Sequence, residues 1–179
     1  MKHRSERKNL TYKELRDELF RKARKTVAIG LCTCLQCGIC SASCPPGRIA
    51  EFRTRQLIRR TSLGLKVDIK NEDLWLCTTC YTCQERCPKK IEIVSMIIAL
   101  RNIAAEKGNI IPEHRRVCHM FIRYGHAVPL NDENREKRIR LGLVENPPNA
   151  QSVEEALNQL QLLVKKIRFD EKVDFKWDQ

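Results

Sequence analysis

The sequence of 179 residues contains no long uninterrupted apolar run. A membrane-spanning helix needs about 18 or more consecutive apolar residues. The longest apolar stretch, residues 91–105, is interrupted by Glu92, Ser95, Arg101 and Asn102. The first 25 residues are highly charged, and the apolar segment of a secretory signal does not follow them. We therefore expect a cytoplasmic protein that has no membrane span of its own.

Aromatic residues are scarce, at 6% of the chain, and few of them lie among the basic residues. Binding to nucleic acid calls for a groove-reading motif or for aromatic side chains interleaved with a basic patch. The sequence shows neither. A nucleic-acid partner is therefore not expected.

The common catalytic motifs are absent as well. The sequence has no glycine-rich dinucleotide fingerprint, no P-loop, no HExxH and no Ser/His/Asp arrangement. We therefore do not expect this chain to form a catalytic site by itself.

Cysteine, in contrast, is abundant, with ten residues. A disulfide scaffold would suit a secreted chain, whereas clustered cysteines in a reducing compartment more often bind metal. Eight of the ten follow the pattern C-x2-C-x2-C-x3-C-P twice, and the second run repeats the first after 43 residues. The two runs are Cys34, Cys37, Cys40 and Cys44 before Pro45, and Cys77, Cys80, Cys83 and Cys87 before Pro88.

This spacing is typical of [4Fe–4S] ligation. Two residues between ligands allow a tight turn that presents three sulfur atoms to one cubane, and the fourth cysteine, followed by proline, points away. In two-cluster proteins with this run, the fourth cysteine ligates the other cluster. The sets carried over to this chain are Cys34, Cys37, Cys40 and Cys87 for cluster 1, and Cys77, Cys80, Cys83 and Cys44 for cluster 2.

Structural zinc is the alternative interpretation of the same cysteines. Zinc sites usually draw two separated C-x2-C pairs, and two tetrahedral ions do not account for C-x2-C-x2-C occurring twice. A zinc-binding nucleic-acid module is therefore the less favoured hypothesis. Cys32 and Cys118 remain outside both runs. Cys32 could lie beside a cluster without ligating it, and Cys118 is expected to be a small buried side chain.

Hydrophobic periodicity and capping signals predict a mainly α protein. Capping boxes at Thr11 with Glu14 and at Ser152 with Glu155 predict two of its helices, and residues 27–29 are interpreted as a short strand or a buried turn. The expected helices span residues 11–25, 47–61, 71–76, 91–107, 112–124, 132–141 and 152–168.

We predict four parts along the chain. Residues 1–26 form a basic N-terminal helix, and residues 27–108 form the two-cluster domain. Residues 109–145 form a helical extension, and residues 146–179 form a C-terminal helix and tail for partner docking.

The 32 residues between Cys44 and Cys77 are too many for a minimal two-cluster ferredoxin, and they suggest helices. The chain resembles the α-helical ferredoxins, and most closely the C subunit of heterodisulfide reductase from methanogenic archaea. The resemblance covers most of the chain. It rests on the basic N-terminal helix and on the segments CTCLQCGICSASCPPG, DLWLCTTCYTCQERCPKKIEIV and KGNIIPEHRRVCHMFIRYGHAVPLN.

This resemblance implies an electron-transfer protein with two [4Fe–4S] clusters. Such a protein passes electrons from the flavin- and iron–sulfur-containing A subunit to the CCG-rich catalytic B subunit, which reduces the heterodisulfide of coenzyme M and coenzyme B in methanogenesis. A hydrogenase or formate dehydrogenase would belong to the larger complex. The alternative is an iron–sulfur subunit of another oxidoreductase of the succinate dehydrogenase or fumarate reductase type.

The chain is strongly basic, since 34 Lys and Arg against 22 Asp and Glu give a formal net charge of +12. Much of this charge could form solvated helix faces, and part could dock acidic surfaces of protein partners. Cations near a cluster favour its more negative reduced state and raise its potential. The candidates next to the cysteine runs are Arg48, Arg86, Lys89 and Lys90.

The C-terminal tail carries Phe169, Phe175 and Trp177 on a charged background. A frayed chain end is one expectation for such a segment. Aromatic anchors for a partner protein are the other expectation, and we favour this one.

Overall fold

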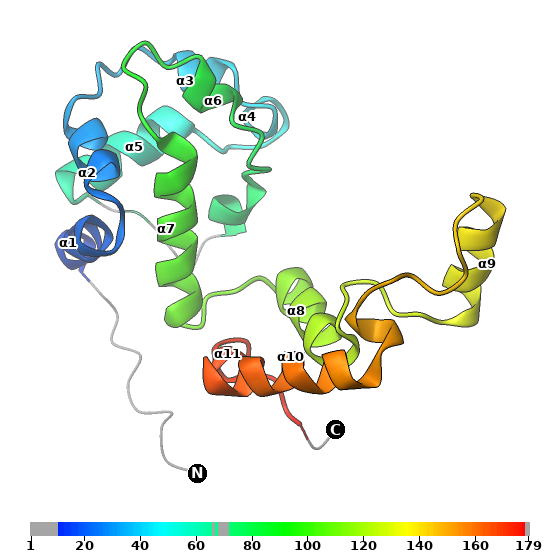
Figure 1. Ribbon diagram of the computed structural model, residues 1–179. Helices are drawn as coiled ribbons and strands as arrows, with labels where there is room; N and C mark the ends of the chain where they lie inside the picture. Colours follow the sequence, from blue (N-terminus) through cyan, green and yellow to red (C-terminus); the bar gives the residue numbers. More distant parts are fainter. Residues whose placement is uncertain (1–10, 66, 68–71, 178–179) are drawn as a thin grey trace. The chain divides into compact units, whose positions relative to one another are not determined.

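The structure is a computed structural model that describes residues 11–65, 67 and 72–177. These residues form helices and no strand, which confirms the predicted mainly α class. No helix within the described ranges has the length and apolar character needed to cross a membrane. The chain divides into two compact units, Met1–Asn109 and Ile110–Gln179, which we call unit 1 and unit 2 (Figure 1).

Unit 1 contains all eight cysteines of the two runs. Its long helices are connected by loops and short helical turns, which carry the cysteines. The elements are α1 (Tyr12–Lys22), α2 (Lys25–Cys32), α3 (Ile39–Ala42), α4 (Pro46–Ile49), α5 (Thr54–Leu63), the 3-10 helix η1 (Glu72–Leu76), α6 (Thr82–Glu85) and α7 (Ile93–Glu106).

Helix α7 is the centre of the unit 1 core. Its side chains Met96, Ile97, Leu100 and Ile103 are completely buried. Helices α1, α2 and α6 and the 3-10 helix η1 all pack against it. The prediction of a helix over 91–107 that is apolar around most of its circumference is thus confirmed, with slightly shorter bounds.

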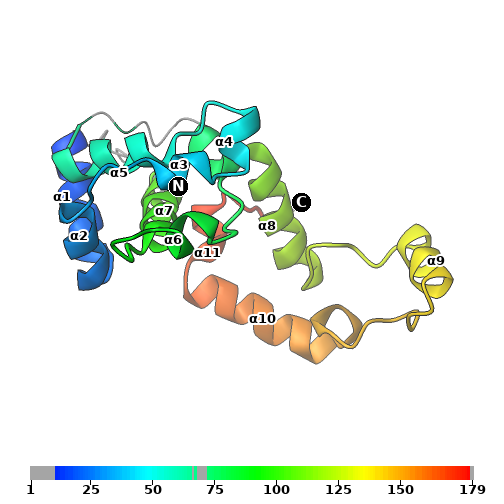
Figure 2. The same cartoon turned by 90° about the horizontal axis from the view of Figure 1, so that it is seen from above.

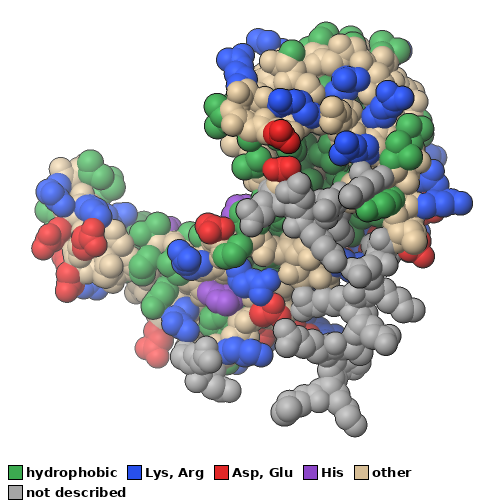
Figure 3. All heavy atoms as spheres, turned by 180° about the vertical axis from the view of Figure 1, so that it is seen from behind, with side chains coloured by type: hydrophobic (Ala, Val, Ile, Leu, Met, Phe, Trp, Pro, Cys, Tyr) green, Lys and Arg blue, Asp and Glu red, His purple; other side chains and the backbone are tan. Residues whose placement is uncertain are grey.

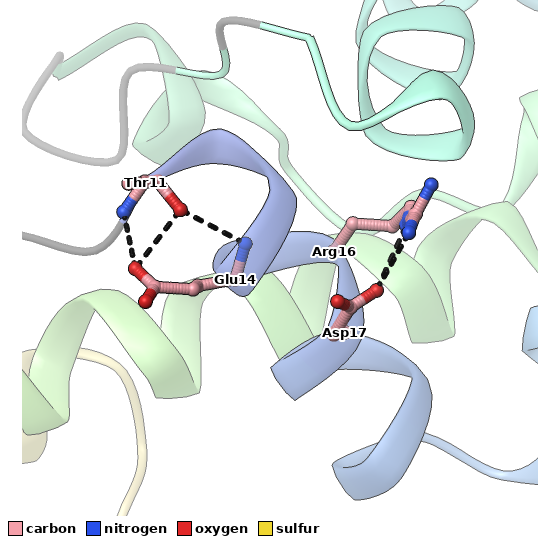
Figure 4. Close-up of polar contacts among 4 residues, drawn as sticks. All are labelled: Thr11, Glu14, Arg16 and Asp17. Atoms are coloured by element: carbon pink, nitrogen blue, oxygen red, sulfur yellow. Dashed lines mark hydrogen bonds and ion pairs between the residues drawn. The ribbon is translucent and has the colours of Figure 1, made fainter.

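Helix α1 begins at the predicted capping box (Figure 4). The Thr11 hydroxyl accepts a hydrogen bond from the Glu14 backbone N–H at 3.3 Å. The Thr11 backbone N–H donates to the Glu14 carboxylate at 2.7 Å. The box therefore satisfies two backbone donors at the helix start. The same helix carries an ion pair of Arg16 with Asp17 at 2.8 Å.

The prediction of a strand or turn over 27–29 is wrong, because these residues lie inside α2. Val27 and Leu31 are four residues apart and are both buried on one face of that helix. A three-residue apolar window was too short to show this helical spacing.

The single helix predicted over 47–61 is also wrong, because α4 ends at Ile49 and α5 begins at Thr54. Phe52, between the two helices, is buried in the core. The Arg53 guanidinium donates to the carbonyl groups of Gly47 and Ala50 at 2.7 and 2.9 Å, which stabilises the break. A Cβ on Gly47 would lie 2.8 Å from the Phe52 carbonyl oxygen, so this close approach requires glycine.

The helix predicted over 71–76 corresponds to η1. The predicted cap at Asn71 lies outside the described residues.

Unit 2 is built mainly on the packing of α8 against α10. Helix α8 has the predicted bounds and ends at Gly125 in a left-handed conformation. The elements are α8 (Pro112–Tyr124), α9 (Asp132–Arg140), the 3-10 helix η2 (Ala150–Ser152), α10 (Glu154–Lys166) and α11 (Phe169–Lys172).

The second predicted capping box is wrong. Helix α10 begins after Val153 without a side-chain cap. The Ser152 hydroxyl instead donates to the Pro147 carbonyl at 2.7 Å. Ser152 belongs to η2, whose start is capped by the side chain of Asn149.

The C-terminal tail is folded as far as Trp177, where the described residues end, so the expectation of a frayed end is wrong for this part. Val173 and Phe175 are buried in the core of unit 2 with Ile122 and Val164. The indole N–H of Trp177 donates to Asp170 at 2.7 Å. The tail aromatics therefore contribute to the fold of unit 2, which a frayed end would not do.

Candidate metal centres

The structure brings the cysteines of unit 1 around two cavities. We call them cavity 1 and cavity 2. Each cavity is lined by three cysteines of one run and by the fourth cysteine of the other run. Cavity 1 is lined by Cys34, Cys37, Cys40 and Cys87, and cavity 2 by Cys44, Cys77, Cys80 and Cys83.

The two cysteine loops repeat one backbone conformation. Gln36 and Thr79 are equivalent in the 43-residue repeat, and both have positive φ angles, 57° and 53°. The equivalent pair Gly38 and Tyr81 also lies in the left-handed region, at 86° and 61°. A side chain in that region costs on the order of 1–2 kcal/mol, so the loop geometry at Tyr81 is retained against its local preference.

The loops continue into two short helices, α3 and α6, which are also equivalent in the repeat. These helices pack against each other. Figure 1 shows them side by side at one end of α7, and Figure 2 looks down on that end. Cys40 lies on α3 and Cys83 lies on α6, and both are buried. The two halves of the duplication therefore meet at their third cysteines.

The thiols at this junction interact electrostatically with one another. Burial first, and then the neighbouring thiols, raise the pKa of Cys83 to about 12. Those neighbours include Cys40 and Cys44 of the first run. Burial likewise raises the pKa of Cys40. A metal that binds here must displace protons from buried thiols, which couples metal binding to folding.

The rims of the cavities are more open. Cys37 and Cys80 are exposed, and hydrogen bonding by Thr82 lowers the pKa of the Cys80 thiol. Each site therefore combines a buried inner sulfur with an exposed outer one. This arrangement can enclose a metal group while leaving one side near the surface.

A single ion and a cluster place different demands on four sulfur ligands. A tetrahedral zinc ion needs all four sulfur atoms at about 2.3 Å from one point. In the described ranges, no three Cys, His, Asp or Glu side chains are close enough together to hold one metal ion. A cubane does not require this, because each of its thiolates binds a different iron.

Polar groups in the cavity walls also fit an iron–sulfur cube. The Thr54 hydroxyl lines cavity 2, is buried, and has no hydrogen-bond partner among the described residues. The side-chain amide N–H of Gln36 donates to the Cys34 sulfur at 3.2 Å in cavity 1. Sulfur atoms of a bound cluster accept such hydrogen bonds, which orient the ligands and tune the metal.

The four cations predicted beside the cysteine runs have different positions. Lys89 lines cavity 1, and Arg86 donates to the Ser43 hydroxyl at 3.3 Å. Arg48 and Lys90 are exposed and line neither cavity.

Sequence reasoning missed two arginines near the cysteines. Arg55 on α5 lines cavity 1. Arg101 on α7 donates to the carbonyl groups of Leu74 and Cys77 at 3.0 and 2.6 Å, and it lies 5.4 Å above the Trp75 ring. Both are far from the cysteine runs in sequence, so no local signal identifies them.

The two remaining cysteines lie outside the cavities. Cys32 is exposed at the end of α2. Cys118 is partly buried, packs against the core of unit 2, and has its pKa raised by that burial.

Together the helical fold and the paired cysteine cavities define a two-cluster iron–sulfur protein. Comparison with known families agrees, because residues 30–91 match the 4Fe-4S dicluster domain. The chain therefore carries two [4Fe–4S] clusters.

Relatives identify the family more closely. The chain is 49% identical to the iron-sulfur C subunit of CoB--CoM heterodisulfide reductase from Methanopyrus kandleri, over 82% of this chain and 77% of the relative. It is 46% identical to the second C subunit of the same reductase from Methanocaldococcus jannaschii, over 81% and 78%. It is 46% identical to the C subunit of the Ferredoxin/F(420)H(2)-dependent CoB-CoM heterodisulfide reductase of Methanosarcina acetivorans, over 85% and 94%. The chain belongs to the family of heterodisulfide reductase iron-sulfur C subunits.

Proposed function

We propose that this chain is a non-catalytic relay in a cytoplasmic heterodisulfide reductase complex. It accepts electrons from a flavin-containing A subunit and passes them to a catalytic B subunit, which reduces the heterodisulfide of coenzyme M and coenzyme B. A hydrogenase or formate dehydrogenase supplies the complex with electrons. The proposal rests on the family of the chain and on the cysteine arrangement in unit 1.

The observation that carries the proposal is that four thiols surround each cavity. Four cysteine ligands complete the coordination of a [4Fe–4S] cube. No iron is then left open for a substrate, and the bound cubes supply single-electron transfer. The packing of α3 against α6 keeps the two sites adjacent, which favours transfer from one to the other.

The ligand sets proposed are those that share a cavity. Cys87 completes the first set and Cys44 completes the second, so each half of the duplication holds one ligand of the other half. Exchange of the fourth ligand links cluster assembly to the association of α3 with α6. The proposed sets are Cys34, Cys37, Cys40 and Cys87, and Cys44, Cys77, Cys80 and Cys83.

Paired cysteine substitutions test this exchange. We expect Cys44→Ser and Cys80→Ser to perturb one and the same EPR signal of the reduced protein, and Cys87→Ser and Cys37→Ser to perturb the other. Cys118→Ser, in unit 2, is the matched control and should leave both signals unchanged. If Cys44→Ser perturbs the same signal as Cys37→Ser, the exchange of ligands is wrong.

Anaerobic affinity purification of the tagged chain from its own cells tests the partners. We expect a flavoprotein and a CCG-rich protein to co-purify with it. The +12 charge suits docking to acidic surfaces, and Figure 3 shows Lys and Arg side chains distributed over one face of unit 1. Recovery of the chain with other redox proteins, and without these two, would contradict the assignment.

A further inference from the structure

The two cavities match in their cysteines but differ in charge. Arg55 and Lys89 both line cavity 1. None of the described residues that line cavity 2 carries a charged side chain. A cation in the wall of a site stabilises the more negative, reduced state of the group that it surrounds.

The difference occurs at equivalent positions of the repeat. Lys89 is the second residue after Cys87 and lines cavity 1. Pro46 is the second residue after Cys44 and lines cavity 2. The duplication has thus placed a lysine beside one site and a proline beside the other.

The start of α5 lies between the two sites. Thr54, which is buried, lines cavity 2, and its neighbour Arg55 lines cavity 1. The Arg55 backbone N–H donates to the Ser41 hydroxyl at 2.9 Å, which fixes this end of α5 against α3. The Arg55 side chain passes Gly38, with its Cδ atom 3.7 Å from where a Cβ on that glycine would be. The Arg55 side chain therefore lies against the first cysteine loop.

Hydrogen bonding occurs at both sites and does not by itself produce this difference, because the Cys80 sulfur of cavity 2 also shares a hydrogen bond with the Thr82 hydroxyl at 3.5 Å. The Gln36 amide donates to the Cys34 sulfur in cavity 1. Thr79 is the equivalent residue beside cavity 2, and its hydroxyl donates instead to the Thr78 carbonyl at 2.7 Å. Hydrogen bonds to cluster sulfur are among the factors that set the reduction potential of a cluster.

On the cavity 2 side, a comparable cation is Arg101. It donates to the carbonyl groups of Leu74 and Cys77 and does not line the cavity. The Arg101 guanidinium binds backbone carbonyl groups next to Cys77. Arg55 and Lys89, in contrast, line cavity 1 itself. The wall of cavity 1 therefore carries more positive charge than the wall of cavity 2.

We propose that cavity 1 holds the cluster of higher reduction potential and that Arg55 and Lys89 produce the difference. This inference rests on the proposed relay and its ligand sets. One electron passes from the reduced site in cavity 2 to the oxidised site in cavity 1, so that cavity 2 loses one unit of negative charge and cavity 1 gains it. Electrons therefore arrive at the Cys77 side and leave from the Cys34 side.

A redox titration of the cluster-loaded chain, followed by EPR, tests the order. We expect two waves in the wild type. Arg55→Gln and Lys89→Gln should each shift the higher-potential wave to more negative values, and by more than the lower wave. Arg101→Gln should shift the lower wave. Arg59→Gln, an exposed position one turn further along α5 that lines neither cavity, is the matched control and should shift neither.

Two results would overturn the proposal. In the first, Arg55→Gln or Lys89→Gln shifts the potential of the lower wave by more than that of the higher wave. In the second, a chain that holds about eight irons, the content of two cubes, titrates in a single wave. Because Lys89 is exposed, we expect Lys89→Gln to fold like the wild type. The shift of the two waves in Lys89→Gln therefore tests the proposal even if Arg55→Gln does not assemble its clusters. A wild-type chain with fewer irons would instead contradict the ligand sets.

Discussion

At the scale of single residues, the cysteine positions were the most predictable part of the site. Their spacing predicts the two ligand sets, and the cysteines of each predicted set line one cavity. Arg55 and Arg101 were not predictable, because they reach the site only through the packing of α5 and α7. Tyr81 was not predictable either, since the left-handed conformation it adopts is set by its loop and opposes its own preference.

Arg101 gives the first prediction at this scale. We expect Arg101→Gln to destabilise unit 1 by about 2 kcal/mol, because two carbonyl groups lose a charged hydrogen-bond donor. The thermal melting midpoint of the cluster-loaded chain measures the effect. Arg101→Lys keeps the charge and should lose less. Equal melting of the wild type and Arg101→Gln would show that these hydrogen bonds do not stabilise the loop before Cys77.

At the scale of elements, local signals predicted helices where capping and periodicity agree, as at α1, α7 and α8. They failed where contacts that do not follow the helical period decide the outcome. The break between α4 and α5 depends on the burial of Phe52 and on the Arg53 hydrogen bonds. At α10, the Ser152 hydroxyl bonds to Pro147 and leaves the expected cap unformed. Both features need residues outside the local helical pattern.

The α1 capping box supports a second prediction. We expect Thr11→Ala to lower the stability of the chain by about 1 kcal/mol, because the first turn of α1 loses its side-chain cap. Chemical denaturation followed by circular dichroism measures the loss. Lys13→Ala, at an exposed position in the same turn, is the control and should change little. A loss for Lys13→Ala as large as that for Thr11→Ala would rule out the cap as the cause.

The core face of α7 supports a third prediction. Leu100 is completely buried, whereas Ile98 on the same helix is 39% exposed. We expect Leu100→Ala to cost about 3 kcal/mol, because it opens a cavity in the core of unit 1. Ile98→Ala should cost much less. The two denaturation curves should therefore separate clearly, and coincident curves would contradict the assigned core.

At the scale of the whole molecule, unit 2 carries an exposed apolar groove, which we propose as a docking face for the partner proteins. Leu163 and Ile167 on and just after α10 are 61% and 62% exposed and line an apolar groove with Phe121 and Phe169. The tail aromatics are needed for the unit 2 core, so deleting the tail would disturb the fold as well as any docking. A point substitution on the exposed face of α10 separates the two effects.

We expect Leu163→Asp to weaken co-purification of the partner proteins severalfold, because it places a charge in an apolar contact. The iron content of the chain should be unchanged, since Leu163 lies in unit 2. Lys166→Asp, a charge change on the same helix outside the groove, is the control. Unimpaired co-purification of Leu163→Asp would remove α10 as a docking face.

The proposed relay is tested most directly by reduction of the catalytic B subunit in a reconstituted complex. The reduced flavin-containing A subunit, the B subunit and this chain are mixed anaerobically, and the redox spectrum of the B subunit is followed over time. We predict that the B subunit is reduced when the cluster-loaded chain is present, and that reduction is lost when the chain is omitted or replaced by Cys87→Ser. Reduction of the B subunit at the same rate without the chain would contradict the account.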